Sequence, residues 1–127
     1  MDLLRLRLQE LDPVVDYFIL IEANLTHSKL PKPFYFQEHR HLFTPYLDKI
    51  IYVQLDAAYL LAYSGESHWD RETLQRDAVM RGLQAYGAGP DDLVIVSDLD
   101  EIPMRDLIRD LRDCREATFP ALLTLDW

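Results

Sequence analysis

The sequence lacks the features that define several common classes of protein. Cys114 is the only cysteine among 127 residues, which excludes a disulfide framework and a cysteine-based zinc cluster. No apolar run reaches the roughly 18 residues of a membrane-spanning helix, and charges as early as Asp2 and Arg5 are unlike a signal peptide. We therefore expect a soluble, cytoplasmic chain.

Positive charge and glycine are also scarce. The chain has 13 Lys and Arg residues against 22 Asp and Glu residues, which gives a formal net charge of -9. Because no basic stripe stands out, we expect no nucleic-acid partner, and an anionic ligand would need a cation or a local cluster of arginines. The four glycines form neither of the common phosphate-binding motifs. Nothing in the sequence indicates the oligomeric state.

Apolar residues, in contrast, make up 49% of the chain, which is sufficient for a core. Their periodicity predicts strands and helices in alternation, with an irregular segment over 56–67. The predicted strands are 14–22, 49–55, 93–98 and 118–124, and the predicted helices are 3–11, 34–42, 69–86 and 105–114. This order is typical of a three-layer α/β/α sandwich with a mostly parallel sheet. The apolar end at 121–127 has no cap or polar tail, so we expect residues 1–127 to be part of one domain truncated at its C-terminus.

The most informative stretch is 93–103, where apolar residues run directly into three carboxylates. A short β-branched run bounded by turn residues predicts a buried strand, which places Asp98, Asp100 and Glu101 where that strand leaves the sheet. Ligands bind at this edge of open α/β sheets. Asp98 and Asp100 share one side of an extended chain, so they can converge on Mg²⁺ or Mn²⁺. The alternative is that these acids cap the following helix.

Glu22 and Arg76 each have two readings, and Cys114 has one. Glu22 follows the strand at 14–22 and reaches the same sheet edge if the strands are parallel; otherwise it is a solvated strand end. Arg76 lies on the inward side of the helix at 69–86, where it pairs with Glu72 or reaches an anion or the acids at 98–101. Cys114 is expected on the apolar face of the last helix, where it would serve packing rather than chemistry.

The motifs, taken in order along the chain, resemble glycosyltransferase family 17. The segments that carry the resemblance are Arg7–Leu11, Val15–Phe18, Ile21–Thr26, Lys32–Pro33, Lys49–Val53, Asp91–Leu93 and Ser97–Pro103. The resemblance implies a GT-A-like fold and the inverting transfer of a sugar to a glycan or glycoconjugate acceptor. It also implies the donor, which would be a UDP-sugar, with N-acetylglucosamine supplied from UDP-GlcNAc. Golgi members of the family carry an N-terminal anchor, so the resemblance implies a Golgi location only if such an anchor is missing from this sequence.

The resemblance further implies roles for individual residues. Asp98 and Asp100 would hold Mn²⁺ or Mg²⁺ against the donor diphosphate, where the metal neutralises the leaving UDP. Glu22 and Asn24 become candidates for the nucleotide pocket, and Arg76 becomes a candidate for supporting the site. Inverting transfer needs a general base for the acceptor hydroxyl, and Glu101 is the candidate in this chain.

Two other functions stay open. A haloacid-dehalogenase-like phosphatase also places Asp-x-Asp after an apolar strand, with the first Asp as nucleophile and Mg²⁺ beside it. Its motif usually lies near the N-terminus and continues into a small pair such as Gly-Thr, whereas here Glu101, Ile102 and Pro103 follow. The non-enzyme alternative is a truncated domain that binds nucleotide and turns nothing over.

Overall fold

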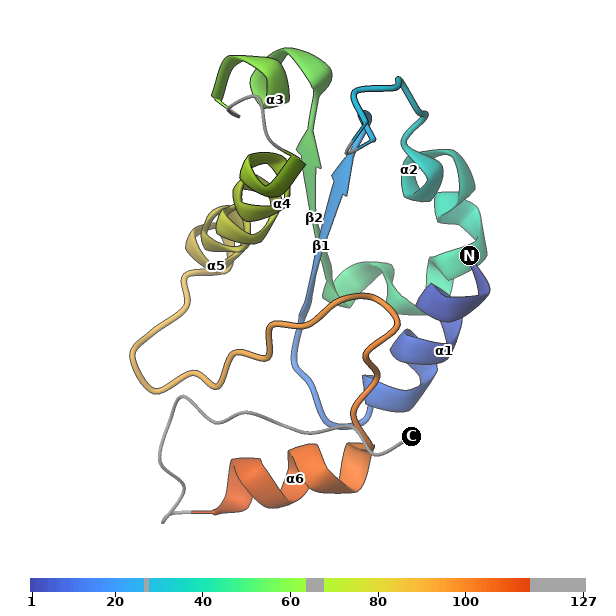
Figure 1. Cartoon of the computed structure of the whole chain (residues 1–127). Helices are drawn as coiled ribbons and strands as arrows, with labels where there is room; N and C mark the ends of the chain where they lie inside the picture. Colours follow the sequence, from blue (N-terminus) through green and yellow to red (C-terminus); the bar gives the residue numbers. More distant parts are fainter. Residues whose placement is uncertain (27, 64–67, 115–127) are drawn as a thin grey trace. The chain divides into compact units, whose positions relative to one another are not determined.

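The structure is a computed structural model that describes residues 1–26, 28–63 and 68–114, without the side chains of residues 63, 68, 69, 71 and 72 (Figure 1). It divides into two compact units: one contains Met1–Asp16 and the chain from Asp91 onward, and the other is Tyr17–Pro90. The strand predicted at 118–124 lies outside the described residues. No described helix has both the length and the apolar character needed to cross a bilayer.

The unit of residues 17–90 contains a parallel two-stranded sheet. β1 (Phe18–Ala23) pairs with β2 (Ile50–Leu55) in a register that places Leu20 opposite Tyr52. The parallel direction predicted for these strands is confirmed. β1 begins at Phe18 rather than at residue 14, so the prediction was wrong for its first four positions.

Helices cover both faces of this sheet (Figure 1). α2 (Tyr35–His39) lies on the face that carries Tyr52, whose ring centroid is 4.9 Å from that of Phe36. α4 (His68–Asp77) and α5 (Val79–Tyr86) cover the opposite face. α5 lies so close to β1 that a Cβ atom added to Gly82 would clash with Ile19 Cγ2. The α/β layering is therefore confirmed for this part of the chain.

Two segments around this sheet depart from the prediction. The residues at 56–67 do not form one irregular segment, because α3 (Ala57–Tyr63) is helical. Asp56 Oδ1 accepts the Tyr59 N–H at 2.7 Å, which satisfies a donor at the helix start, and Leu60 is fully buried. The predicted helix 34–42 is a short α2 followed by a 3-10 helix, η1 (Arg40–Lys49), which contains Pro45.

The long helix predicted at 69–86 is divided at Ala78, which separates α4 from α5. Ala78 is buried with Leu25, Leu55 and Leu60 in the core cluster of this unit, so the break brings the chain onto the core. Gly87 ends α5 with a φ of 82°, a left-handed conformation that glycine adopts without strain. The helix end predicted at Gly87 is confirmed.

In the other unit, α1 (Asp2–Leu11) and α6 (Arg105–Asp113) are both formed as predicted. α1 buries Leu4, Leu8 and Leu11, and α6 buries Ile108. Cys114 follows the end of α6 and is exposed, so its predicted place on an apolar face was wrong.

The strand predicted at 93–98 was also wrong. The segment is irregular, and Leu93, Val94 and Val96 are 40%, 41% and 60% exposed. A β-branched sequence favours extended chain, but a strand also needs a neighbour to bond its N–H and C=O groups. No described segment pairs with these residues. The acids at 98–101 thus follow an exposed irregular segment.

Candidate functional site

The acids at 98–101 lie in a tight turn, and we call Ser97–Glu101 the acidic turn. The Glu101 N–H donates to the Asp98 carbonyl at 3.2 Å. In return, Glu101 Oε2 accepts the Asp98 N–H at 2.9 Å. These two bonds close the turn from both ends and bring the three carboxylates onto one short loop. One Glu101 oxygen is thereby used within the turn itself.

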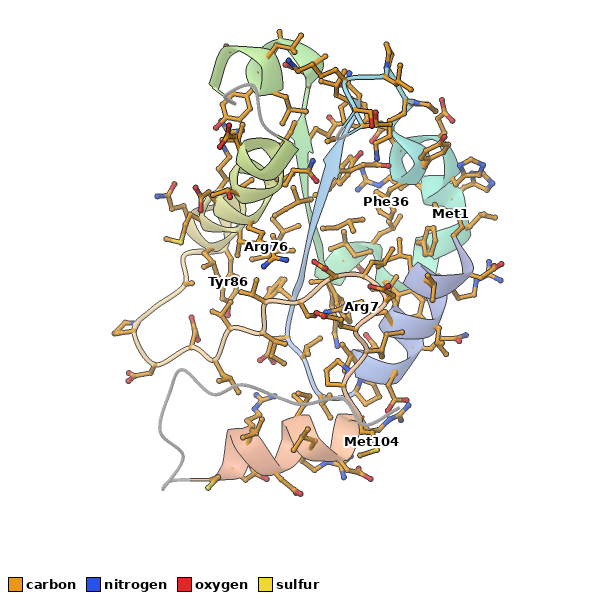
Figure 2. The ribbon with its side chains drawn as sticks, in the orientation of Figure 1. Met1, Arg7, Phe36, Arg76, Tyr86 and Met104 are labelled. Atoms are coloured by element: carbon orange, nitrogen blue, oxygen red, sulfur yellow. The ribbon has the colours of Figure 1, made fainter. Side chains whose placement is uncertain are left out.

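Arg7 of α1 binds this turn with three hydrogen bonds, and Figure 2 shows its side chain reaching from α1 to the loop. Nη1 donates to the carbonyls of Asp98 and Glu101, each at 2.8 Å, and Nη2 donates to Ser97 Oγ at 2.6 Å. Burial lowers the pKa of Arg7, while the nearby Glu101 carboxylate opposes that shift.

Arg7 is not among the site residues predicted from the sequence, although the sequence contains a signal for it. Arg7 lies three residues after Leu4 and four before Leu11, so it shares the helix face that those leucines bury. An arginine on a buried face needs partners for its donors. The partners are main-chain carbonyls about 90 residues away, which periodicity within α1 does not indicate.

Arg7 contacts backbone carbonyls and the Ser97 hydroxyl of the acidic turn, and not the aspartate carboxylates. The side chains of Asp98 and Asp100 are exposed, and Asp100 has no side-chain hydrogen bond or ion pair with any described residue. Across the described ranges, no group of three or more His, Cys, Asp and Glu side chains is placed to hold a metal ion. Two hard oxygen donors fit Mg²⁺ or Mn²⁺ when phosphate oxygens and water supply the remaining ligands.

Glu22, near the end of β1, has a structural role. Its Oε1 and Oε2 lie 3.1 and 3.2 Å from the Phe36 nitrogen, whose N–H they accept at the start of α2. Oε2 also accepts the Tyr52 hydroxyl at 2.5 Å. Burial and then the hydrogen bond to Glu22 raise the pKa of Tyr52. Glu22 is therefore not the solvated strand end that was one alternative.

Asn24 follows β1 directly and is fixed through its backbone. Its N–H donates to the Leu55 carbonyl at 3.2 Å, and its carbonyl accepts the Lys32 N–H at 2.9 Å. Its side-chain Oδ1 is buried and has no hydrogen-bond partner within the described part of the chain. A buried acceptor without a donor costs about 1–3 kcal/mol.

Arg76 lies in the last turn of α4, and its side chain is exposed. The Glu72 side chain, its predicted partner, lies outside the described residues. Both readings of Arg76 therefore stay predictions.

Comparison with known proteins identifies the family to which the chain belongs. The sequence profile of glycosyltransferase family 17 matches residues 1–126. The chain is 36% identical to the beta-1,4-mannosyl-glycoprotein 4-beta-N-acetylglucosaminyltransferases of Homo sapiens and Rattus norvegicus, over 83% of its own length. The Mus musculus enzyme of the same name is 35% identical over the same share.

These alignments cover only part of each relative. The chain spans 20% of the length of the human, rat and mouse enzymes that it matches. No solved structure matches the chain.

Proposed function

The chain belongs to glycosyltransferase family 17, and from that premise we propose that it is the donor-binding part of a metal-dependent inverting glycosyltransferase. The donor in this proposal is a UDP-sugar, UDP-GlcNAc, and the acceptor is a glycan or glycoconjugate. The observation that carries the proposal is the acidic turn, where Asp98 and Asp100 are exposed on a loop closed by its own hydrogen bonds and by Arg7.

In this proposal Asp98 and Asp100 hold Mn²⁺ or Mg²⁺. When bound, the metal neutralises charge on the leaving diphosphate. Glu101 closes the turn through Oε2, so Oε1 is the oxygen that would take a proton from an acceptor hydroxyl if Glu101 is the general base.

The nucleotide contacts are proposed separately, for residues of the unit Tyr17–Pro90. Asn24 offers a buried acceptor, Oδ1, which suits an N–H of a nucleotide base. Glu22 contributes by position, because its oxygens already hold the start of α2 and the Tyr52 hydroxyl. Arg76 contributes a cation for an anionic donor.

The test is calorimetry with UDP and UDP-GlcNAc, each with and without Mn²⁺. We expect UDP to bind only with metal, and Asp100→Ala to abolish that binding. Asp110→Ala removes another exposed carboxylate, on α6, and serves as the matched control. Equal UDP affinity without metal, or unchanged binding by Asp100→Ala, would overturn the proposal. Turnover of a simple phosphate ester, lost in Asp98→Asn, would instead favour a phosphatase.

A further inference from the structure

We propose that Arg7 is a positioning residue for the proposed metal site: it fixes the backbone of the acidic turn that carries Asp98 and Asp100. This inference rests on the proposed function, because it concerns the same two aspartates. It adds a residue on α1, far from them in sequence, on which their arrangement depends.

The guanidinium of Arg7 is matched to the shape of the acidic turn. One planar group spans the whole turn, from Ser97 Oγ through the Asp98 carbonyl to the Glu101 carbonyl, with distances of 2.6, 2.8 and 2.8 Å. Fixing carbonyls at both ends of the loop restrains the peptide groups on either side of Asp100. A lysine has the same charge but presents a point donor instead of a fork, so it cannot reproduce this set of bonds.

The positive charge of Arg7 also stabilises the acidic turn. Three carboxylates on one short loop repel each other, and a nearby positive charge reduces that repulsion. Arg7 supplies this charge while its donors bind carbonyls and a hydroxyl instead of the aspartates. It therefore stabilises the turn without taking the oxygens that a cation would bind.

The packing of α1 fixes the position of Arg7. Arg7 projects from a helix whose Leu4 and Leu8 are buried, so the guanidinium is attached to a packed element. From the same helix, Glu10 Oε1 accepts the Arg105 N–H at 3.0 Å at the start of α6. α1 thus holds the chain both at the acidic turn and four residues after it.

The experiment compares Arg7→Lys and Ser97→Ala with the unmodified chain. Arg5→Lys is the matched control, because Arg5 is an exposed arginine on the same helix. Mn²⁺ binding in the presence of UDP is measured by electron paramagnetic resonance. Amide exchange at Asp98 and Glu101 is measured by NMR, without metal. We expect Arg7→Lys to weaken Mn²⁺ binding about 10-fold, as supporting residues of metal sites do, and to accelerate both amides. Ser97→Ala should have a smaller effect in the same direction.

The outcomes separate this inference from the proposed function. If the unmodified chain binds Mn²⁺ with UDP and both variants bind it equally well with unchanged exchange, only the role of Arg7 is overturned. If the unmodified chain does not bind Mn²⁺ with UDP, the proposed function fails and the positioning role fails with it. Should Arg7→Lys not fold, Ser97→Ala decides: unchanged affinity and exchange overturn the inference, and a loss in both supports it.

Discussion

Glu22 and the acids of the acidic turn were predicted to serve one site, yet the fold uses them differently. The Glu22 oxygens accept a backbone N–H of α2 and the Tyr52 hydroxyl. In the acidic turn, Arg7 binds carbonyls, and the Asp100 carboxylate stays exposed. The comparison teaches that an acid after an apolar run is a ligand candidate only if the fold does not already use its oxygens.

The largest effect on stability should come from Glu22→Ala. It removes a charged acceptor from two donors that are not fully exposed, so we expect a loss of about 2–3 kcal/mol in the free energy of unfolding. Asp100→Ala, at an exposed position, should change that free energy by less than about 0.5 kcal/mol. Urea denaturation followed by circular dichroism measures both.

Glu22→Gln gives a second view of the same contact. It keeps an acceptor but removes the charge, so the pKa of Tyr52 should fall, because the bond to Glu22 contributes to raising it. Absorbance titration of the phenol reads this shift. If Glu22→Ala and Asp100→Ala prove equally mild, or if the Tyr52 titration does not move, the contrast between the two regions is wrong.

A smaller loss is expected from Gly82→Ala, which tests whether the sheet side of the comparison depends on packing as well as on hydrogen bonds. An added methyl group would clash with the Ile19 side chain, so either that side chain or α5 must shift. Overpacking of this kind costs about 1–3 kcal/mol. Gly89→Ala is the control, since nothing lies within 4 Å of its added Cβ. Thermal unfolding of both variants measures the difference, and equal melting temperatures would contradict the close approach of α5.

The sequence allowed the local features of this fold to be predicted and obscured those that depend on distant partners. Periodicity located α1, β2 and α6, and Gly87 marked the end of α5. The strand predicted at 93–98 was wrong because apolar, β-branched composition does not provide a neighbouring strand.

The same distinction holds for the candidate site. The acids at 98–101 were selected by their spacing together with the apolar run before them, although the strand predicted for that run is not formed. The partners that give Arg7 and Glu22 their roles lie about 90 and 14 residues away along the chain, beyond the reach of a local pattern.

The smallest effect should come from Glu10→Gln, which sharpens the comparison by testing a second glutamate at a helix start. Like Glu22, Glu10 accepts a backbone N–H, that of Arg105 in α6, and its Oε2 also lies 2.9 Å from Arg105 Nη2.

The hydrogen bonds to Arg105 lower the pKa of Glu10. A lowered pKa means that the ionised form is favoured in the folded state, so this stabilisation is present at neutral pH and is lost as the pH falls below about 5. Glu10→Gln should therefore flatten the acid side of the stability profile, with a loss at pH 7 smaller than that of Gly82→Ala and reduced further by salt. Asp106→Asn, which removes the exposed pair with Arg109 inside α6, is the control. Denaturation midpoints from pH 3 to pH 7 decide the matter, and a Glu10→Gln profile parallel to that of the unmodified chain would show that Glu10 does not share the capping role of Glu22.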